Sequence, residues 1–149
     1  MESKLYPPVG FHFDVTFGFR SKVANDMYFQ SVSGLNYSLQ TDTLKEGGEN
    51  RFEHVIPVRN KCSDLVLRRG IFKSGDTQIT EWCLQAFNNF EFSPVDIVIN
   101  LLNEQHKPLM TWNVHHAWPK SWKVADLNAD KGEILIETFE LNYNYFTFK

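Results

Sequence analysis

The stretch Phe11–Phe19 reads FHFDVTFGF and alternates apolar and polar residues without a break. The apolar phase consists of Phe11, Phe13, Val15, Phe17 and Phe19, and the other phase of His12, Asp14, Thr16 and Gly18. Because successive side chains of an extended strand point to opposite faces, a period of two separates the two groups. The stretch therefore predicts a β-strand with one buried face and one face in water.

Similar strand patterns recur along most of the chain. They are expected at Met27–Tyr37, Val55–Val58, Asp64–Arg69, Val95–Leu102, Leu109–Trp118 and Glu133–Phe148. Gly34 predicts a bulge or bend inside the first of these, and a change of phase predicts a bulge in the last. Together with an aromatic content of 15%, the patterns predict a mainly β fold, an antiparallel β-sandwich or barrel with one flanking α-helix.

One segment, Asp76–Asn88, changes to a helical period. Its apolar residues recur at i, i+3, i+4, i+7 and i+8, which places them on one stripe of a helix over about residues 76–89. The stripe expected to pack on the sheet consists of Ile79, Trp82, Cys83, Ala86 and Phe87. Asp76 or Ser74 is expected to cap the start of this helix, and Asn88-Asn89 to end it.

Length and composition restrict the function classes. A chain of 149 residues buries one sizeable core, so a single domain over residues 1–149 is expected. A net charge of −3 with 15 scattered Lys and Arg argues against nucleic-acid binding. The sequence contains neither a secretion signal nor a run of 18 apolar residues. We therefore expect synthesis and assembly in the cytoplasm, without a direct membrane anchor.

Residue types that carry chemistry are present without a supporting context. Cys62 and Cys83 stand apart without metal-ligand spacing, and both are expected to be reduced and structural. His115 and His116 are adjacent in a strand, so they are expected on opposite faces, unable to hold one metal ion together. No metal, cofactor or catalytic residue is therefore expected, and the chain is predicted not to be an enzyme.

Two further groups of residues, three tryptophans and a set of acidic residues, are candidates for a binding or active site. Trp112, Trp118 and Trp122 are expected in core or interface packing, with a ring-binding groove as the alternative. Asp14 could meet Glu137 or Glu140 on a wet face of the sheet, but any two acids of a small sheet could do so. Neither group defines an active site.

The stretch Thr43–Pro57, TLKEGGENRFEHVIP, separates two strand patterns. It has three possible interpretations: a phosphate-binding loop, a flexible hairpin tip or an extended arm. A phosphate-binding loop would need Gly-Lys-Ser/Thr at a helix start, which this stretch lacks. A flexible hairpin tip remains an alternative. The apolar residues Phe52, Val55 and Ile56 favour an extended arm that contacts another molecule. The edges of the predicted sheet also favour contact with another molecule, because their unpaired N–H and C=O groups require either barrel closure or a strand from another chain.

Read in order, several anchor segments resemble the inner tube proteins of contractile injection systems and contractile phage tails, the Hcp-like family. The anchors are PPVGFHFDV (Pro7–Val15), FQSVSGL (Phe29–Leu35), LKEGGENR (Leu44–Arg51), Ile56-Pro57, LVLRRGIF (Leu65–Phe72), EWC (Glu81–Cys83), Asp96–Trp122 and Glu137–Phe146. The resemblance implies a tail-tube domain whose hexameric rings stack into a hollow tube, propelled by a contracting sheath. It also implies sheath, baseplate or spike and tube-terminating proteins as partners, and effectors as candidate cargo in the lumen.

The resemblance assigns an arm over about residues 41–58 that contacts an adjacent subunit or ring. The interface residues carried over are Leu44, Lys45, Glu46, Gly47, Gly48, Glu49, Asn50, Arg51, Phe52, Val55 and Ile56. Gly47 and Gly48 would permit the reversal at the tip. Val58-Arg59 and Lys61-Cys62-Ser63 depart from the family pattern. The alternative function is a monomeric β-barrel that holds a small ligand among its aromatic residues.

Overall fold

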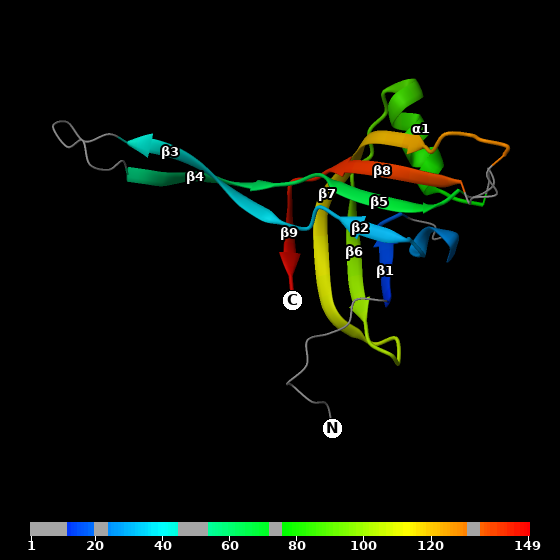
Figure 1. Ribbon diagram of the computed structural model, residues 1–149, viewed down its shortest axis with the longest axis horizontal. Coiled ribbons are helices and arrows are strands. Elements are labelled where there is room, and N and C mark those ends of the chain that lie inside the picture. Colours follow the sequence, from blue (N-terminus) through cyan, green and yellow to red (C-terminus); the bar gives the residue numbers. More distant parts are fainter. Residues whose placement is uncertain (1–11, 20–23, 45–53, 72–75, 131–134) are drawn as a thin grey trace.

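The computed structural model describes residues 12–19, 24–44, 54–71, 76–130 and 135–149 (Figure 1). In chain order its elements are β1 (His12–Phe17), the 3₁₀ helix η1 (Ala24–Met27), β2 (Ser31–Ser33), β3 (Tyr37–Leu44), β4 (His54–Cys62), β5 (Leu65–Gly70), α1 (Ile79–Asn89), β6 (Val95–Leu102), β7 (Pro108–Val124), β8 (Ile136–Asn142) and β9 (Tyr145–Phe148). The predicted mainly β fold with one flanking α-helix is confirmed.

Most strands join one antiparallel sheet organised around β7. The strand order is β1-β6-β7-β8-β5-β2, and β9 also pairs with β7. β7 is 17 residues long, so it pairs with β9 through Trp112–His115 and with β8 through Trp118–Val124. The strand predicted over Glu133–Phe148 is instead divided into β8 and β9 at Tyr143-Asn144. The bulge predicted from the change of phase between Ile136 and Phe139 is not found there, because β8 pairs with β5 without a register shift from Ile136 to Leu141.

The core lies between the sheet and α1. In β1, Val15 is 0% and Phe17 is 3% exposed, while Thr16 between them is half-buried. The alternation that predicts this strand is therefore confirmed in the described part of the stretch. β6, β7 and β8 add Ile97, Ile99, Val114, Phe139 and Leu141 to the same buried cluster.

Helix α1 differs from its prediction at its start and at one position of its stripe. It begins at Ile79, and its start is capped from another element, because Asp26 Oδ2 accepts the Gln78 N–H at 2.8 Å. It ends at Asn89, as predicted, and the residue that follows, Phe90, is left-handed (φ 54°). Ser74 lies outside the described residues.

The stripe of α1 is buried at four of its five predicted positions. Ile79, Trp82, Cys83 and Ala86 are buried, whereas Phe87 is 43% exposed. At 100° per residue, Phe87 lies about 80° from Ile79 on the border of the stripe, and the helix ends two residues later. The prediction that Phe87 packs on the sheet is therefore wrong.

The bend predicted at Gly34 is present. Gly34 has a φ of 96°, in the left-handed region that favours glycine. A Cβ at this position would lie 2.0 Å from the carbonyl oxygen of Asp64, so the two backbones approach closely here. Gly34 separates β2 from β3 and thereby sets the direction in which the chain leaves the main sheet.

Candidate functional site

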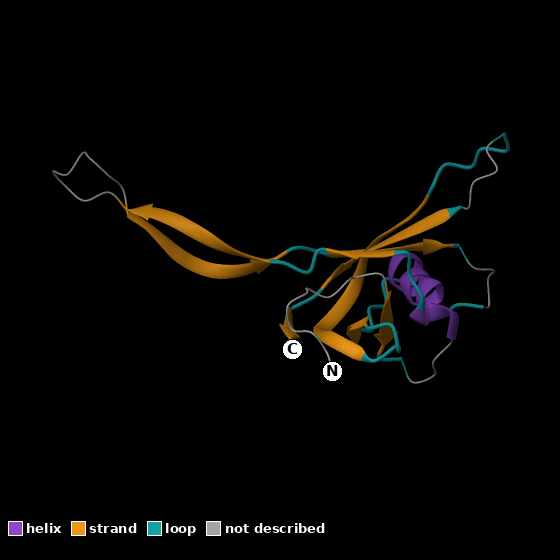
Figure 2. Cartoon of the chain, turned by 60° about the horizontal axis from the view of Figure 1, so that its bottom comes forward, coloured by secondary structure: helices purple, strands orange, loops and turns teal. Residues whose placement is uncertain are grey.

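Strands β3 and β4 form an antiparallel hairpin that pairs with neither end of the main sheet. It projects far from the rest of the molecule, on the side away from α1 (Figures 1 and 2). We call β3 and β4 the arm, and the remaining described residues the body. All described arm residues except Cys62 are exposed. An isolated two-stranded hairpin is marginally stable in water, so this arm needs support from elsewhere.

The base of the arm is fixed to the body by specific contacts. The ring of Tyr37 stacks on Phe146 of β9 at 4.3 Å between centroids, and its hydroxyl donates to the Phe146 carbonyl oxygen. Beside it, the Ser63 hydroxyl donates to Asn36 Oδ1 at 2.8 Å. These contacts orient the arm at its root and leave its outer length projecting.

The outer length of the arm exposes apolar side chains. They are Leu39, Leu44, Val55, Ile56 and Val58, each between 44% and 64% exposed. Contiguous exposed apolar residues of this kind mark interaction surfaces. Among the interface residues assigned to the arm, Leu44, Val55 and Ile56 belong to this set. The others, Lys45, Glu46, Gly47, Gly48, Glu49, Asn50, Arg51 and Phe52, lie outside the described residues.

The main sheet is open within the described residues. Its strand path ends at β1 on one side and at β2 on the other, and no described pairing joins the two. The outer N–H and C=O groups of β1 are therefore available for a strand from outside this chain. The six-residue edge of β1 is the longer of the two ends.

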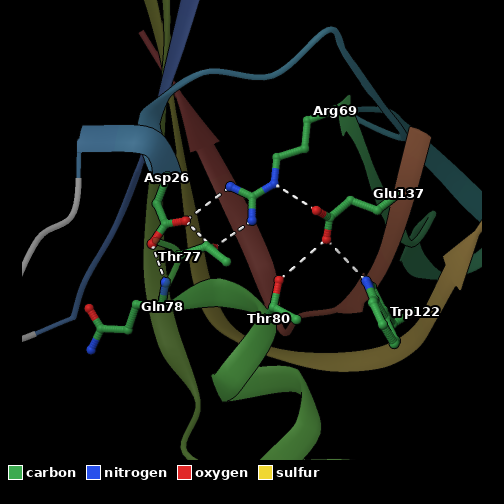
Figure 3. Close-up of polar contacts among 7 residues, drawn as sticks. All are labelled: Asp26, Arg69, Thr77, Gln78, Thr80, Trp122 and Glu137. Atoms are coloured by element: carbon green, nitrogen blue, oxygen red, sulfur yellow. Dashed lines mark hydrogen bonds and ion pairs between the residues drawn. The ribbon is translucent and has the colours of Figure 1, made fainter. Parts of the chain in front are cut away.

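A buried polar cluster, not anticipated from the sequence, ties the elements of the body together (Figure 3). Arg69 on β5 is 2% exposed, and its Nη1 lies 2.9 Å from Asp26 Oδ1. Its Nη2 donates to Thr77 Oγ1 at 2.6 Å, and its Nε lies 3.4 Å from Glu137 Oε2. The guanidinium carbon is also 5.3 Å from the ring centroids of Phe29 and Phe139.

The second carboxylate of this cluster extends the network to the helix and to β7. Glu137 Oε1 accepts hydrogen bonds from Trp122 Nε1 at 3.1 Å and from Thr80 Oγ1 at 3.3 Å. Since Glu137 is 1% exposed, its charge is balanced inside the protein by Arg69 instead of by water. The cluster thus joins η1, β5, α1, β7 and β8, and its role is structural.

The sequence contained a signal for this cluster. Leu65, Leu67 and Arg69 occupy the same phase of β5, so a period of two places Arg69 in the core. Glu137 likewise shares the phase of Phe139 and Leu141 in β8. A charged residue in an otherwise apolar phase requires a buried partner of opposite charge.

The two histidines considered for a metal site have other surroundings. His115 stacks on Tyr145 at 4.5 Å between ring centroids, and its Nδ1 lies 3.8 Å from Asp96 Oδ2. His116 has a φ of 61° at a register shift of β7, and its N–H donates to Asp96 Oδ1 at 3.1 Å. Within the described ranges, no three or more His, Cys, Asp or Glu side chains are grouped to hold a metal ion.

The cysteines and the acid pair form no reactive centre in the described structure. Cys62 and Cys83 are both free thiols. Burial, with the charge of nearby Glu137, raises the pKa of the Cys83 thiol to about 12, so this thiol is protonated at neutral pH. Asp14 accepts a hydrogen bond from Asn100 Nδ2 at 2.9 Å, while Glu137 belongs to the Arg69 cluster. The structure does not bring these two acids together.

The tryptophans considered for a ring-binding groove pack instead against neighbouring side chains. Trp112 contacts the ring of Phe148 at 5.6 Å between centroids, and Trp118 contacts Phe92 at 5.7 Å. A shallow groove of about 440 Å³ lies elsewhere, beside β1, with Phe13, Met27, Leu102 and His106 among its lining residues. None of the helices in the described segments is long and apolar enough to cross a membrane.

An open antiparallel sheet, one flanking helix and a projecting hairpin define a class of β-rich subunit that is completed by assembly. Comparison with known proteins identifies the family. The model of the T4-like virus tail tube protein gp19 family matches residues 9–147, so the chain belongs to this family. It is a tail tube subunit of the kind found in contractile injection systems.

Solved structures agree with this assignment over nearly the whole chain. A chain of the anti-feeding prophage (AFP) baseplate is 30% identical, with a TM-score of 0.83 and coverage of 97% of this chain and 96% of that one. A chain of the PVC sheath-tube complex in its extended state is 27% identical, with a TM-score of 0.79 and coverage of 98% and 93%. Hcp1 from Flavobacterium johnsoniae, at 17% identity, TM-score 0.57 and coverage of 93% and 94%, shares the fold. No curated protein sequence matches the chain.

Proposed function

We propose that six copies of this chain form a ring, and that the rings stack into the hollow inner tube of a contractile injection system. The whole chain acts as one tube domain with a structural role, and it makes or breaks no covalent bond. Support comes from the family match over residues 9–147 and from the similar chains of the AFP baseplate and the PVC sheath-tube complex. Assembly takes place in the bacterial cytoplasm.

The observation that carries this proposal is the arm. The outer length of the hairpin exposes five large apolar side chains, and the described contacts with the body lie at its base. Burial of this surface against a neighbouring copy would stabilise the assembly by roughly 25 cal/mol for each Å² of apolar area removed from water. The arm residues assigned from the family resemblance, from Leu44 to Ile56, are therefore proposed as the contact between subunits or rings.

The open ends of the main sheet supply the second contact in this proposal. If β1 of one subunit pairs with a strand of the next, the separate sheets become one barrel around the lumen. Sheath, baseplate or spike and tube-terminating proteins are the proposed partners of the finished tube, and effector proteins its proposed cargo.

The test is assembly of the purified chain, imaged by negative-stain electron microscopy, with and without a deletion of Lys45–Asn50. The intact chain is expected to form rings or tubes. The deletion is expected to leave the far-ultraviolet circular dichroism spectrum unchanged and to abolish stacking or ring closure. Tubes of normal length from the deleted chain would refute the role of the arm. A wild-type chain that stays monomeric with its partner proteins present would refute the tube function and favour the small-ligand alternative.

A further inference from the structure

A second exposed apolar surface lies at the C-terminal end of α1. It consists of Phe87, Phe90 and Phe92, which are 43%, 83% and 39% exposed. The rings of Phe90 and Phe92 pack edge to face at 4.9 Å between centroids, and Phe92 contacts Trp118 of β7 at 5.7 Å. We call these three phenylalanines the aromatic patch.

Phe90 is unfavourable in an isolated subunit for two independent reasons. Its side chain is the most exposed of the large hydrophobic residues described. Its backbone also adopts the left-handed conformation (φ 54°, ψ 33°), in which glycine and asparagine are favoured and phenylalanine is rare. A ring held at such a position is explained if it packs against another molecule.

The charge around the aromatic patch restricts what that molecule is. The helix and the loop that carry the patch, residues 76–94, contain three acidic side chains and no Lys or Arg. Glu91 lies between Phe90 and Phe92 in the chain and is exposed. A partner surface complementary to the patch is therefore apolar and carries positive charge.

One face of the arm has this composition. In the β3–β4 register, Leu44 faces His54, Asp42 faces Ile56, Gln40 faces Arg59 and Ser38 faces Lys61. Directly opposed residues of an antiparallel pair share a face, as do alternate residues of one strand. The register shifts between Gln40 and Thr41, so β4 changes phase there and brings Arg59 and Lys61 onto the face of Ile56. This face therefore carries Leu44 and Ile56 toward the tip and Arg59 and Lys61 toward the base, with Asp42 as its acidic residue.

The arm projects on the side of the molecule away from α1, at whose C-terminal end the aromatic patch lies (Figure 1). An arm that projects away from α1 does not reach the patch of its own chain, but it can reach the patch of another copy. We infer that the aromatic patch is the surface that receives the arm of a neighbouring subunit, with Glu91 close to Arg59 or Lys61. Because two unlike surfaces meet, the contact is heterologous and propagates from copy to copy. This inference rests on the proposed tube function and names the partner surface of the arm.

The first test replaces Phe90 by Asn, which removes the ring and suits the left-handed backbone. The Phe90→Asn monomer is expected to melt at the wild-type temperature or above it. Its critical concentration for assembly, measured by light scattering and electron microscopy, is expected to rise about tenfold or more. Leu127→Asn is the matched control, because Leu127 is 80% exposed in a loop outside the patch, and it is expected to assemble like the wild type.

The second test reverses charges across the contact. Glu91→Arg and Arg59→Glu are each expected to weaken assembly, and the double variant is expected to assemble better than either single variant. The inference stands if Phe90→Asn impairs assembly and the double reversal restores it; any other pattern overturns it. Normal tubes from Phe90→Asn that fail to bind the sheath protein would assign the patch to the sheath. In each of these outcomes the wild-type protein still forms tubes. If the wild-type protein formed no tubes, the proposed function itself would be refuted.

Discussion

The arm and the body of this subunit are built from the same kind of antiparallel strand, yet their side chains have opposite environments. Strand β4 ends at Cys62 with nearly every residue exposed, and three residues later β5 begins with Leu65, which is fully buried. Both strands pair in antiparallel ladders, so strand pairing does not explain the difference. The body is stabilised from within by its core and its polar cluster, whereas the arm depends on what it contacts.

The largest expected effect lies in the body, at Arg69. Arg69→Ala leaves the buried Asp26 and Glu137 carboxylates without their common cation, and removing one partner of such a network costs about 3–5 kcal/mol. Chemical denaturation of the monomer measures this loss in the free energy of unfolding. The control is Arg68→Ala, because Arg68 is the exposed neighbour on the same strand, with an expected change within about 0.5 kcal/mol. Equal effects of the two substitutions would contradict the structural role of the cluster.

A smaller effect is expected from the thiol of Cys83 at alkaline pH. Burial raises its pKa to about 12, so the native thiol keeps its proton where the unfolded thiol, with a pKa of about 8.5, has lost it. The unfolded state then binds fewer protons, so the free energy of unfolding falls as pH rises above 8.5, by about 1.4 kcal/mol at pH 9.5. Iodoacetamide at pH 8.5 is expected to alkylate Cys83 only after denaturation. Labelling of Cys83 in the native protein would show that this part of the body opens as readily as the arm.

The smallest effect on the isolated subunit is expected in the arm. Val55→Ser changes a side chain that is 64% exposed, so the free energy of unfolding of the monomer should change by no more than about 0.5 kcal/mol. Val114→Ser makes the same substitution at a fully buried position of β7 and should cost several-fold more. Tube formation should be impaired by Val55→Ser despite its stable monomer. A monomer equally destabilised by both substitutions would remove the distinction between arm and body.

The sequence predicted features that depend on local period and failed where distant segments meet. The alternation in β1 and the bend at Gly34 were readable because each depends on a few neighbouring residues. The pairing of Arg69 with Asp26 was not, because the two residues are 43 positions apart and no local pattern joins them. Phe87 was misplaced because it lies on the border of the stripe, about 80° from Ile79, where helical spacing alone does not show whether the sheet covers a side chain. The residues of the arm tip remain a prediction.

The close approach at Gly34 also bears on the symmetry of the assembly. This residue lies between β2 and Tyr37, the first residue of the arm, and its backbone leaves no room for a methyl group beside Asp64. A side chain here would force the two backbones apart and swing the hairpin through a different angle. A ring closes only when the rotation from each copy to the next divides a full turn evenly. If the arm joins copies as proposed, a changed angle would therefore alter how many copies complete the ring. The diameter of the channel would then depend on the absence of a single carbon atom.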